Sequence, residues 1–250
     1  MVARFANPPM GYFCAKAAGE LGQLIDTWRD PAIRAVVLTG SQGHFITHYS
    51  VQELVDFGAD QAAMQTIGTA LSDGYHALLA RLAALPVPVI AAIDGDCMGG
   101  GFELAMWCDI RISCTADIRI GLPESRLGIM PGGSGTQMLA RLIGAARARE
   151  MILLGTLVTP AEAHRLGLVT MLAVDPVMAA LVLGARFATM NPSALANIKR
   201  AASADEAALS AGLSLEAQCF LDTMRAPQSL DTMRRYLAVA PDMRRRWLDA

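Results

Sequence analysis

The sequence has little charge and no long hydrophobic run. Charged residues make up 18 % of the 250 positions and hydrophobic residues 53 %, a composition that excludes a disordered chain. No uninterrupted apolar stretch reaches the ~18 residues that a membrane helix requires. The segment 1–9 lacks the basic and apolar regions of a secretory signal. We therefore expect a cytoplasmic globular protein without a membrane partner, with one large domain or a domain and a smaller appendage.

Lysine is scarce, and the overall charge is nearly balanced. Lys16 and Lys199 are the only lysines, and Lys plus Arg (21) almost equals Asp plus Glu (23). Without a net positive field, no nucleic-acid partner is expected. Five arginines gather near the C-terminus: Arg234, Arg235, Arg244, Arg245 and Arg246. This cluster is interpreted either as a solvated helix face or as a patch for a phosphate-bearing ligand.

Cysteine and histidine are few and do not form metal-binding patterns. The five cysteines are an odd number without a C-x-x-C pair, and the four histidines show no metal-ligand spacing. We expect free, buried thiols in a reducing compartment and no metal site.

Nucleotide-binding and hydrolase motifs are also missing or incomplete. No Gly-Lys-Ser/Thr sequence supplies a P-loop, and the dinucleotide fingerprint breaks at Cys97. The hydrolase motif G-x-S-x-G fails because Thr136 occupies its last place. These failures leave the possibility of an anion site that does not need a nucleotide.

What the sequence does contain is an alternation of short apolar runs with helical patterns. Runs that are apolar throughout predict strands covered on both faces, as in a parallel α/β sheet. We place them at residues 35–39, 87–93, 110–113 and 118–120. Helical spacing of apolar residues occurs at 16–29, 63–84, 101–107 and 135–143.

The character of the chain changes after about residue 190. Beyond Asn191-Pro192 it is rich in Ala, Met and Arg and poor in strand signals. We predict a β/α core with the active site over residues 1–190 and a helical C-terminal region over residues 191–250.

The most unusual local feature is a glycine triplet, 99–101, between a buried strand and a helix. Glycine permits close approach of a ligand, and the free N–H groups at a helix start favour negative charge on an oxygen. Glu103 follows within the helix, and Glu124 follows a later strand and Pro123. Two carboxylates beside such a site could move a proton and activate a water. Alternatively, the glycines serve only packing and Glu103 only the helix dipole.

Several motifs around these residues follow one another in a recognisable order. They are Pro88–Gly95, Gly99–Met106, Pro123-Glu124, Leu127-Gly128 and Pro131–Gln137. This succession resembles the crotonase (enoyl-CoA hydratase/isomerase) superfamily, and weaker likeness extends over most of the chain.

The resemblance implies an α/β fold, a crotonase-like spiral of repeated ββα units with a C-terminal helical trimerisation region. It also implies a homotrimer or homohexamer that binds an acyl-CoA thioester without a metal or redox cofactor. The backbone N–H groups of Tyr49 and Gly100 would form the oxyanion hole. Glu103 would act as the base for water, and Glu124 would exchange a proton at the α-carbon. Retention of both acids favours an enoyl-CoA hydratase-like lyase that yields 3-hydroxyacyl-CoA.

The resemblance further places Thr47, His48 and Gly99 at the substrate, yet the sequence departs from the family pattern there. Family members usually read Phe-Ser-Ala-Gly-Ala-Asp-Ile where this chain has Phe-Ile-Thr-His-Tyr-Ser-Val at 45–51. The change could alter only packing, select an unusual acyl group, or make His48 an acid/base as in diketone hydrolases of the superfamily.

Two other activities stay open: an enoyl-CoA isomerase, and a non-catalytic acyl-CoA-binding protein whose pocket Tyr49 blocks. Trp247 and the neighbouring arginines are candidates for the nucleotide end of CoA.

Overall fold

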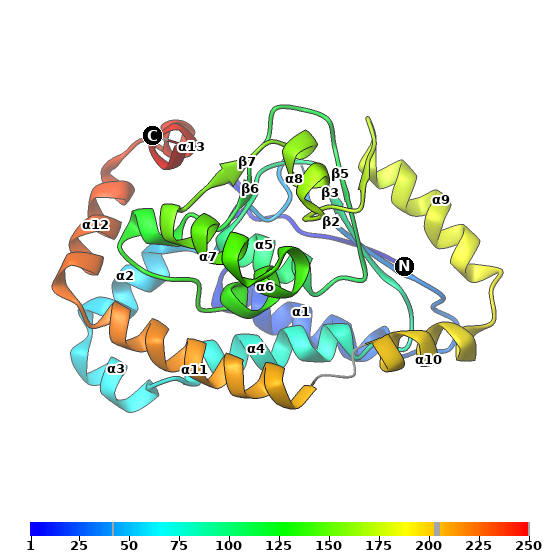
Figure 1. Ribbon diagram of the computed structural model, residues 1–250, viewed down its shortest axis with the longest axis horizontal. Coiled ribbons are helices and arrows are strands. Elements are labelled where there is room, and N and C mark those ends of the chain that lie inside the picture. The colour runs from blue at the N-terminus through cyan, green and yellow to red at the C-terminus, as the bar shows by residue number, and fades with distance from the viewer. Residues whose placement is uncertain (42, 203–205, 250) are drawn as a thin grey trace.

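The fold centres on a sheet of five parallel strands (Figure 1). The computed structural model describes residues 1–41, 43–202 and 206–249. The strand order is β1 (Val2–Arg4), β2 (Val36–Thr39), β3 (Val89–Ile93), β5 (Ile110–Ser113) and β8 (Met171–Leu172). Every residue of β2 and β3 is buried, which confirms strands covered on both faces.

A smaller sheet lies beside the main one, and its first strand leads directly into the glycine triplet 99–101. It contains β4 (Cys97–Met98), β6 (Ile120–Gly121) and β7 (Leu157–Val158), in that order. Strand β4 pairs with β6 in parallel, and β6 pairs with β7 antiparallel.

Helices surround both sheets. Those of the first 190 residues are α1 (Ala15–Thr27), α2 (Val51–Ala59), α3 (Gln61–Ile67), α4 (Ala70–Ala83), α5 (Gly99–Met106), the 3-10 helix η1 (Glu124–Leu127), α6 (Gly135–Ile143), α7 (Ala145–Leu154), α8 (Pro160–Leu166) and α9 (Pro176–Ala188). The later ones are α10 (Pro192–Ala202), α11 (Glu206–Met224), α12 (Pro227–Ala238), the 3-10 helix η2 (Pro241–Met243) and α13 (Arg244–Asp249).

The two faces of the main sheet are covered by different helices (Figure 1). Val37, Ile90 and Ala92 point to one face and pack with Ala180 of α9. Alternate residues of the same strands, such as Leu38, point to the other face and join the main core with α1 and α4. Helix α5 is buried along its whole length and belongs to this same main core, to which it contributes Phe102 and Leu104.

The helical pattern at 63–84 is interrupted, which corrects the prediction of one long helix. Helix α3 ends at Ile67 and α4 begins at Ala70. Between them Gly68 adopts φ +57 and ψ −129, a conformation that is strained for residues with a side chain. Glycine therefore ends α3 although the apolar spacing continues.

The C-terminal helices fold back over the core. Helix α11 contacts α4 and α6, and α12 contacts α2 and η1. From Pro192 onward, the part of the chain that the structure describes contains helices and no strand. The boundary at residue 190 itself remains a prediction.

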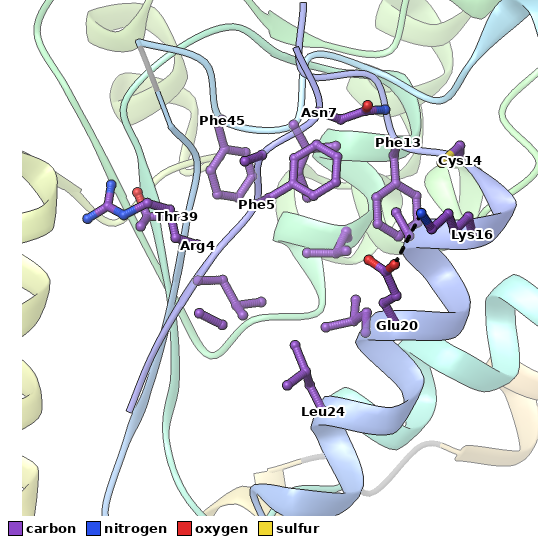
Figure 2. A pocket seen from close by; sticks show the side chains of 17 residues that line it. Arg4, Phe5, Asn7, Phe13, Cys14, Lys16, Glu20, Leu24, Thr39 and Phe45 are labelled. Carbon is purple, nitrogen blue, oxygen red and sulfur yellow. Dashed lines mark ion pairs between the residues drawn. The ribbon is translucent and has the colours of Figure 1, made fainter.

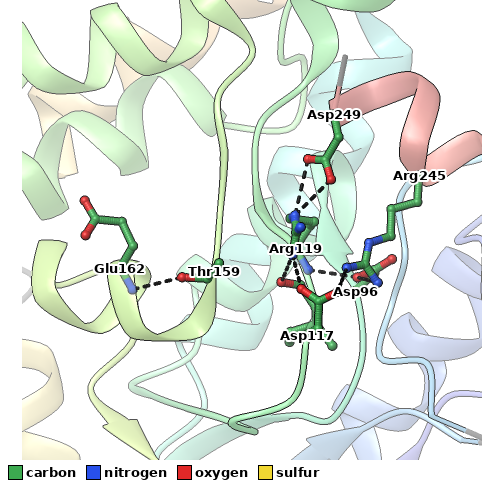
Figure 3. Close-up of polar contacts among 8 residues, drawn as sticks. Asp96, Asp117, Arg119, Thr159, Glu162, Arg245 and Asp249 are labelled. Atoms are coloured by element: carbon green, nitrogen blue, oxygen red, sulfur yellow. Dashed lines mark hydrogen bonds and ion pairs between the residues drawn. The ribbon is translucent and has the colours of Figure 1, made fainter.

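An ion-pair network attaches the last helix to the smaller sheet (Figure 3). Arg119 binds Asp249 of α13 at 3.0 Å and Asp117 at 2.5 Å. Arg245 of α13 binds Asp117 at 2.8 Å and approaches Asp96 to 3.8 Å. Asp117 is exposed, so these contacts serve chiefly to orient α13.

Among the described residues, no helix combines the length and the apolar character that crossing a membrane would require.

Gly101 tests the close packing that positions α5. A Cβ added there would lie 1.9 Å from the Ile46 carbonyl oxygen, so Gly101→Ala should destabilise the fold by about 3 kcal/mol or more. Gly19 on α1 is the matched control, because its surroundings are open and Gly19→Ala should stabilise by ~0.5–1 kcal/mol. Urea unfolding of both variants checks this, and equal stabilities would contradict it.

Candidate active site

The glycine triplet forms the first turn of α5, whereas we predicted that the helix starts after it. Met98 is the N-cap, and Gly99 has φ +48. Gly100 lies against the loop that carries Tyr49: a Cβ added to Gly100 would be 3.0 Å from the Tyr49 Cβ and 3.5 Å from its nitrogen. The Tyr49 nitrogen and the start of α5 are therefore neighbours.

Neither predicted oxyanion donor is used elsewhere in the part of the chain that the structure describes. Within the described chain, no hydrogen bond uses the N–H of Tyr49 or of Gly100. The loop is anchored through its neighbours instead, since Phe13 N–H donates to the His48 carbonyl and Ser50 N–H donates to the Phe13 carbonyl. Two unused N–H groups at adjacent positions can bind one oxygen that gains negative charge.

A cavity of about 240 Å³ joins these donors to both predicted acids. Tyr49, Gly100, Glu103 and Glu124 all line it. Much of the remaining wall is apolar and includes Ala15, Ala18, Leu54, Leu71, Ile129, Met130 and Phe220. The cavity therefore suits an apolar group attached to a polarised carbonyl.

Glu103 is buried but has partners for only one of its oxygens. Its Oε1 accepts hydrogen bonds from the N–H groups of Gly133 and Gly135, each at 2.8 Å. No described residue donates to Oε2. Burial, and then the charges of Glu124 and Glu216, hold the pKa of Glu103 well above its usual range, while the two N–H donors oppose the shift.

Glu124 has weaker support, a hydrogen bond with its own backbone N–H that opposes the rise of its pKa. It begins η1 after Pro123, and among the described residues its buried Oε2 has no hydrogen-bond partner. Burial raises its pKa to about 8, and the charge of Glu216 adds to the effect. Gly99 makes room for this acid, because a Cβ there would lie 2.8 Å from Glu124 Oε1. The two acids interact, so we expect the pair to hold a proton near neutral pH.

Tyr49 and Tyr75 shape the cavity wall. The Tyr75 hydroxyl donates to the Gly100 carbonyl at 2.7 Å and so steadies the first turn of α5. The Tyr49 hydroxyl donates to Glu53 Oε2 at 2.8 Å. That bond holds the Tyr49 ring along the wall, and the cavity stays open beside it.

His48 points away from the cavity. Its Nδ1–H donates to the Tyr49 carbonyl at 2.6 Å, so its Nε2 accepts from the Tyr236 hydroxyl at 2.7 Å. The ring stacks on Tyr12 with centroids 4.4 Å apart. Burial, assisted by the Arg244 charge, lowers the pKa of His48 to about 4, although the bond to Tyr49 opposes this.

None of the three predicted substrate-binding residues lines the cavity, and they pack behind its wall instead: Thr47, His48 and Gly99. The Thr47 hydroxyl donates to the Met10 carbonyl, and the Thr47 carbonyl accepts from Met98 N–H at 2.9 Å. Their contact with a substrate remains a prediction.

At least three of the five C-terminal arginines are engaged within the chain, the first being Arg235, which pairs with Asp231 of the same helix at 3.3 Å. Arg244 donates to the carbonyls of Val239 and Leu237, and its guanidinium lies 5.3 Å from the centre of the Tyr236 ring. Arg245 belongs to the ion-pair network of Figure 3. Trp247 packs on Tyr236 with centroids 5.4 Å apart.

A second cavity, of about 290 Å³, lies between α1 and the edge of the main sheet (Figure 2). Phe5, Phe13 and Phe45 form much of its wall, and the Lys16–Glu20 ion pair borders it at 3.8 Å. None of the predicted site residues lines this cavity. The candidate chemistry belongs to the first cavity alone.

The sequence analysis missed Tyr75, which lines the cavity, and also His76 and Glu216, which do not line it but interact next to it. Glu216 is buried on α11 and reaches the turn that holds Glu103. Its only local signal is an acidic residue in a mostly apolar stretch of the C-terminal region.

The five cysteines are free, and the described residues contain no group of three or more His, Cys, Asp or Glu side chains that could hold a metal ion.

Comparison with known proteins agrees with this geometry. The sequence profile described as enoyl-CoA hydratase/isomerase matches residues 1–240. The chain belongs to the enoyl-CoA hydratase/isomerase family. The predicted crotonase resemblance is thereby confirmed.

Individual family members show the same likeness. A probable enoyl-CoA hydratase of Bacillus subtilis is 32% identical over 236 residues, which are 92% of this chain and 89% of the relative. A probable enoyl-CoA hydratase of Mycobacterium bovis is 37% identical over 194 residues, or 76% and 72% of the two chains. The crystal structure of an enoyl-CoA hydratase/isomerase from Xanthobacter autotrophicus Py2 superposes with TM-score 0.86 at 22% identity, covering 99% and 93%. The α/β crotonase fold with C-terminal helices is confirmed.

The neutral state of His48 predicts a loss of stability in acid. The unfolded chain binds a proton at this residue below pH ~6.5, but the folded chain does so only below about 4. Stability should fall between these values by at most about 3 kcal/mol on account of His48. Urea unfolding at pH 7 and pH 4.5 should show a larger drop for the native protein than for His48→Gln. Equal drops would show that His48 is protonated in the fold.

Proposed function

We propose that the protein adds water reversibly across the double bond of a 2-enoyl-CoA thioester and releases a 3-hydroxyacyl-CoA. One observation carries this proposal: a single cavity is lined by two buried carboxyl groups and by two residues whose backbone N–H groups have no partner in the described part of the chain. The names of the family relatives, both probable enoyl-CoA hydratases, agree with it.

The N–H groups of Tyr49 and Gly100 would bind the thioester oxygen. As water attacks the β-carbon, negative charge moves onto that oxygen, and the two donors stabilise it without having to reorganise. A donor in such a position is worth about 3–4 kcal/mol of the barrier. The Tyr75 bond to the Gly100 carbonyl helps to keep the peptide in place.

The two acids would divide the proton transfers. Of the coupled pair, Glu103 is the acid whose charged form is stabilised by two donated N–H groups, so it is the one that we assign as carboxylate. It takes a proton from water, and the water oxygen forms its bond to the β-carbon. Glu124, whose pKa of about 8 keeps it protonated at neutral pH, gives its proton to the α-carbon of the enolate. The product contains the whole water molecule, and a proton passing between the coupled acids restores the starting state.

The other activities receive less support from this arrangement. A diketone hydrolase would use His48, yet both nitrogens of that ring already have hydrogen-bond partners and His48 does not line the cavity. An isomerase needs only the second acid, which would leave Glu103 without a function. A binding protein blocked by Tyr49 does not agree with the open cavity beside that residue.

Self-association is part of the same proposal. Four apolar side chains are 60–88% exposed: Val174 just before α9, Val182 within it, and Leu153 and Leu154 at the end of α7. Apolar side chains in such positions suit contacts between copies of the chain, as in the trimer or hexamer that we predict.

Substitution of the two acids tests the proposed hydration. Glu103→Gln should lower the turnover of crotonyl-CoA by about a hundredfold or more, because no base then activates water. Glu124→Gln should suppress deuterium exchange at the α-carbon in D2O. Loss of the conjugated-thioester absorbance reports hydration, and NMR reports exchange.

Glu162→Gln is the control, since Glu162 is on α8 and pairs with Arg165, and neither residue lines the cavity. Native turnover in Glu103→Gln, or undiminished exchange in Glu124→Gln, would exclude that residue from its role.

A further inference from the structure

Four consecutive backbone N–H groups at the start of α6 donate alternately to two buried carboxylates. Gly133 and Gly135 donate to Glu103 Oε1 at 2.8 Å. The alternate groups, of Ser134 and Thr136, donate to Glu216, the latter at 2.7 Å. The turn 133–136 is therefore held from both sides, by an acid of the cavity on one and by Glu216 on the other.

Glu216 is fully committed to this turn. It is 2% exposed and lies on α11, outside the cavity lining. Besides the two N–H groups, it accepts from the Thr136 hydroxyl and contacts His76 Nε2 at 3.2 Å. These donors offset the free-energy cost of burying the carboxylate. Without them, the buried charge would strongly destabilise the fold.

The turn needs such support. Ser134 has φ +88, the only positive φ of a residue other than glycine in the described chain. The first N–H groups of α6 have no partners within the helix, and its dipole favours negative charge there. The Trp107 indole N–H also donates to the Ser134 hydroxyl, at 2.6 Å. Glu216 thus stabilises a strained turn whose other two N–H groups carry Glu103.

We propose that Glu216 is a positioning residue of the active site: it fixes the turn 133–136, and through that turn it sets the place of the Glu103 carboxylate in the cavity. This inference rests on the proposed function for its kinetic consequence, but its structural part stands on the shared turn.

The pKa values of Glu103 and Glu124 distinguish a positioning role of Glu216 from a merely structural one, because a purely structural role would leave them unchanged. Glu103 faces Glu124, Glu216 and Tyr75, while Glu216 also faces His76. The negative charge of Glu216 raises the pKa of both cavity acids, after burial as the main cause. Removing that charge eases their ionisation, so their pKa values should fall.

The experiment uses the full chain with Glu216→Gln, which keeps the side-chain shape but loses the charge and one acceptor. The kcat for crotonyl-CoA should fall about tenfold or more while KM changes little, since a displaced base affects chemistry more than binding. In 13C-carboxyl NMR titrations, the Glu103 and Glu124 signals should titrate lower by about half a pH unit or more. Amide exchange at Gly133 and Gly135 should accelerate.

The control is Asp222→Asn, which removes an exposed charge from the same helix, and it should leave all three readouts at native values. Native titration and native exchange in a folded Glu216→Gln protein would overturn the proposal. Should this variant fail to fold, Thr136→Val takes its place, and it should speed exchange at Gly133 and Gly135 and lower kcat severalfold. Native values there would likewise overturn it.

The NMR readouts also separate this proposal from the proposed function. If no enoyl thioester were hydrated by the native protein, hydration would be wrong, whereas shifted carboxyl titrations in Glu216→Gln would still establish the action of Glu216.

Discussion

The site depends on a close approach between backbones that only glycine permits. A Cβ on Gly40 or Gly95 would lie 1.6 Å or 2.2 Å from the carbonyl oxygens of His44 and Gly43, and one on Gly101 would strike the Ile46 carbonyl. Through these contacts the loop 43–49 packs directly on the residues that follow β2 and β3 and on the first turn of α5. The Tyr49 nitrogen consequently lies beside Gly100, and these two residues, whose N–H groups are unused within the described residues, line one cavity. Every catalytic step proposed here uses that pair of donors.

Burial of charge is the second requirement, and the C-terminal helices help to meet it. Glu103 receives two N–H donors from a turn that Glu216 of α11 holds in place, and Phe220 of the same helix closes the cavity wall. Tyr236 of α12 binds His48 behind the oxyanion loop. The C-terminal region therefore completes the site from outside the β/α core. Acids that are buried and only partly compensated keep raised pKa values, which proton transfer at neutral pH requires.

Sequence patterns predicted the local features, namely strands and motifs, and missed the contacts between residues far apart in the chain. The apolar runs identified β2 and β3, because buried parallel strands carry no polar residues. The motif order brought Tyr49, Gly100, Glu103 and Glu124 together, and the structure places all four on one cavity. The break at Gly68 was missed because apolar spacing continues through it. His48 and Glu216 find their partners far away in the chain, at Tyr236 and at the turn 133–136, and no local pattern signals such pairs.

The most direct test of the oxyanion hole is the vibrational frequency of the thioester carbonyl in a bound enoyl-CoA. Crotonyl-CoA labelled with 13C at the carbonyl would be bound to the Glu103→Gln protein, so that turnover is slow, and its infrared difference spectrum recorded against the unlabelled ligand. Two N–H donors from Tyr49 and Gly100 should polarise the C=O bond, and its band should move to lower frequency than in water. A band at the frequency found in solution would contradict the account.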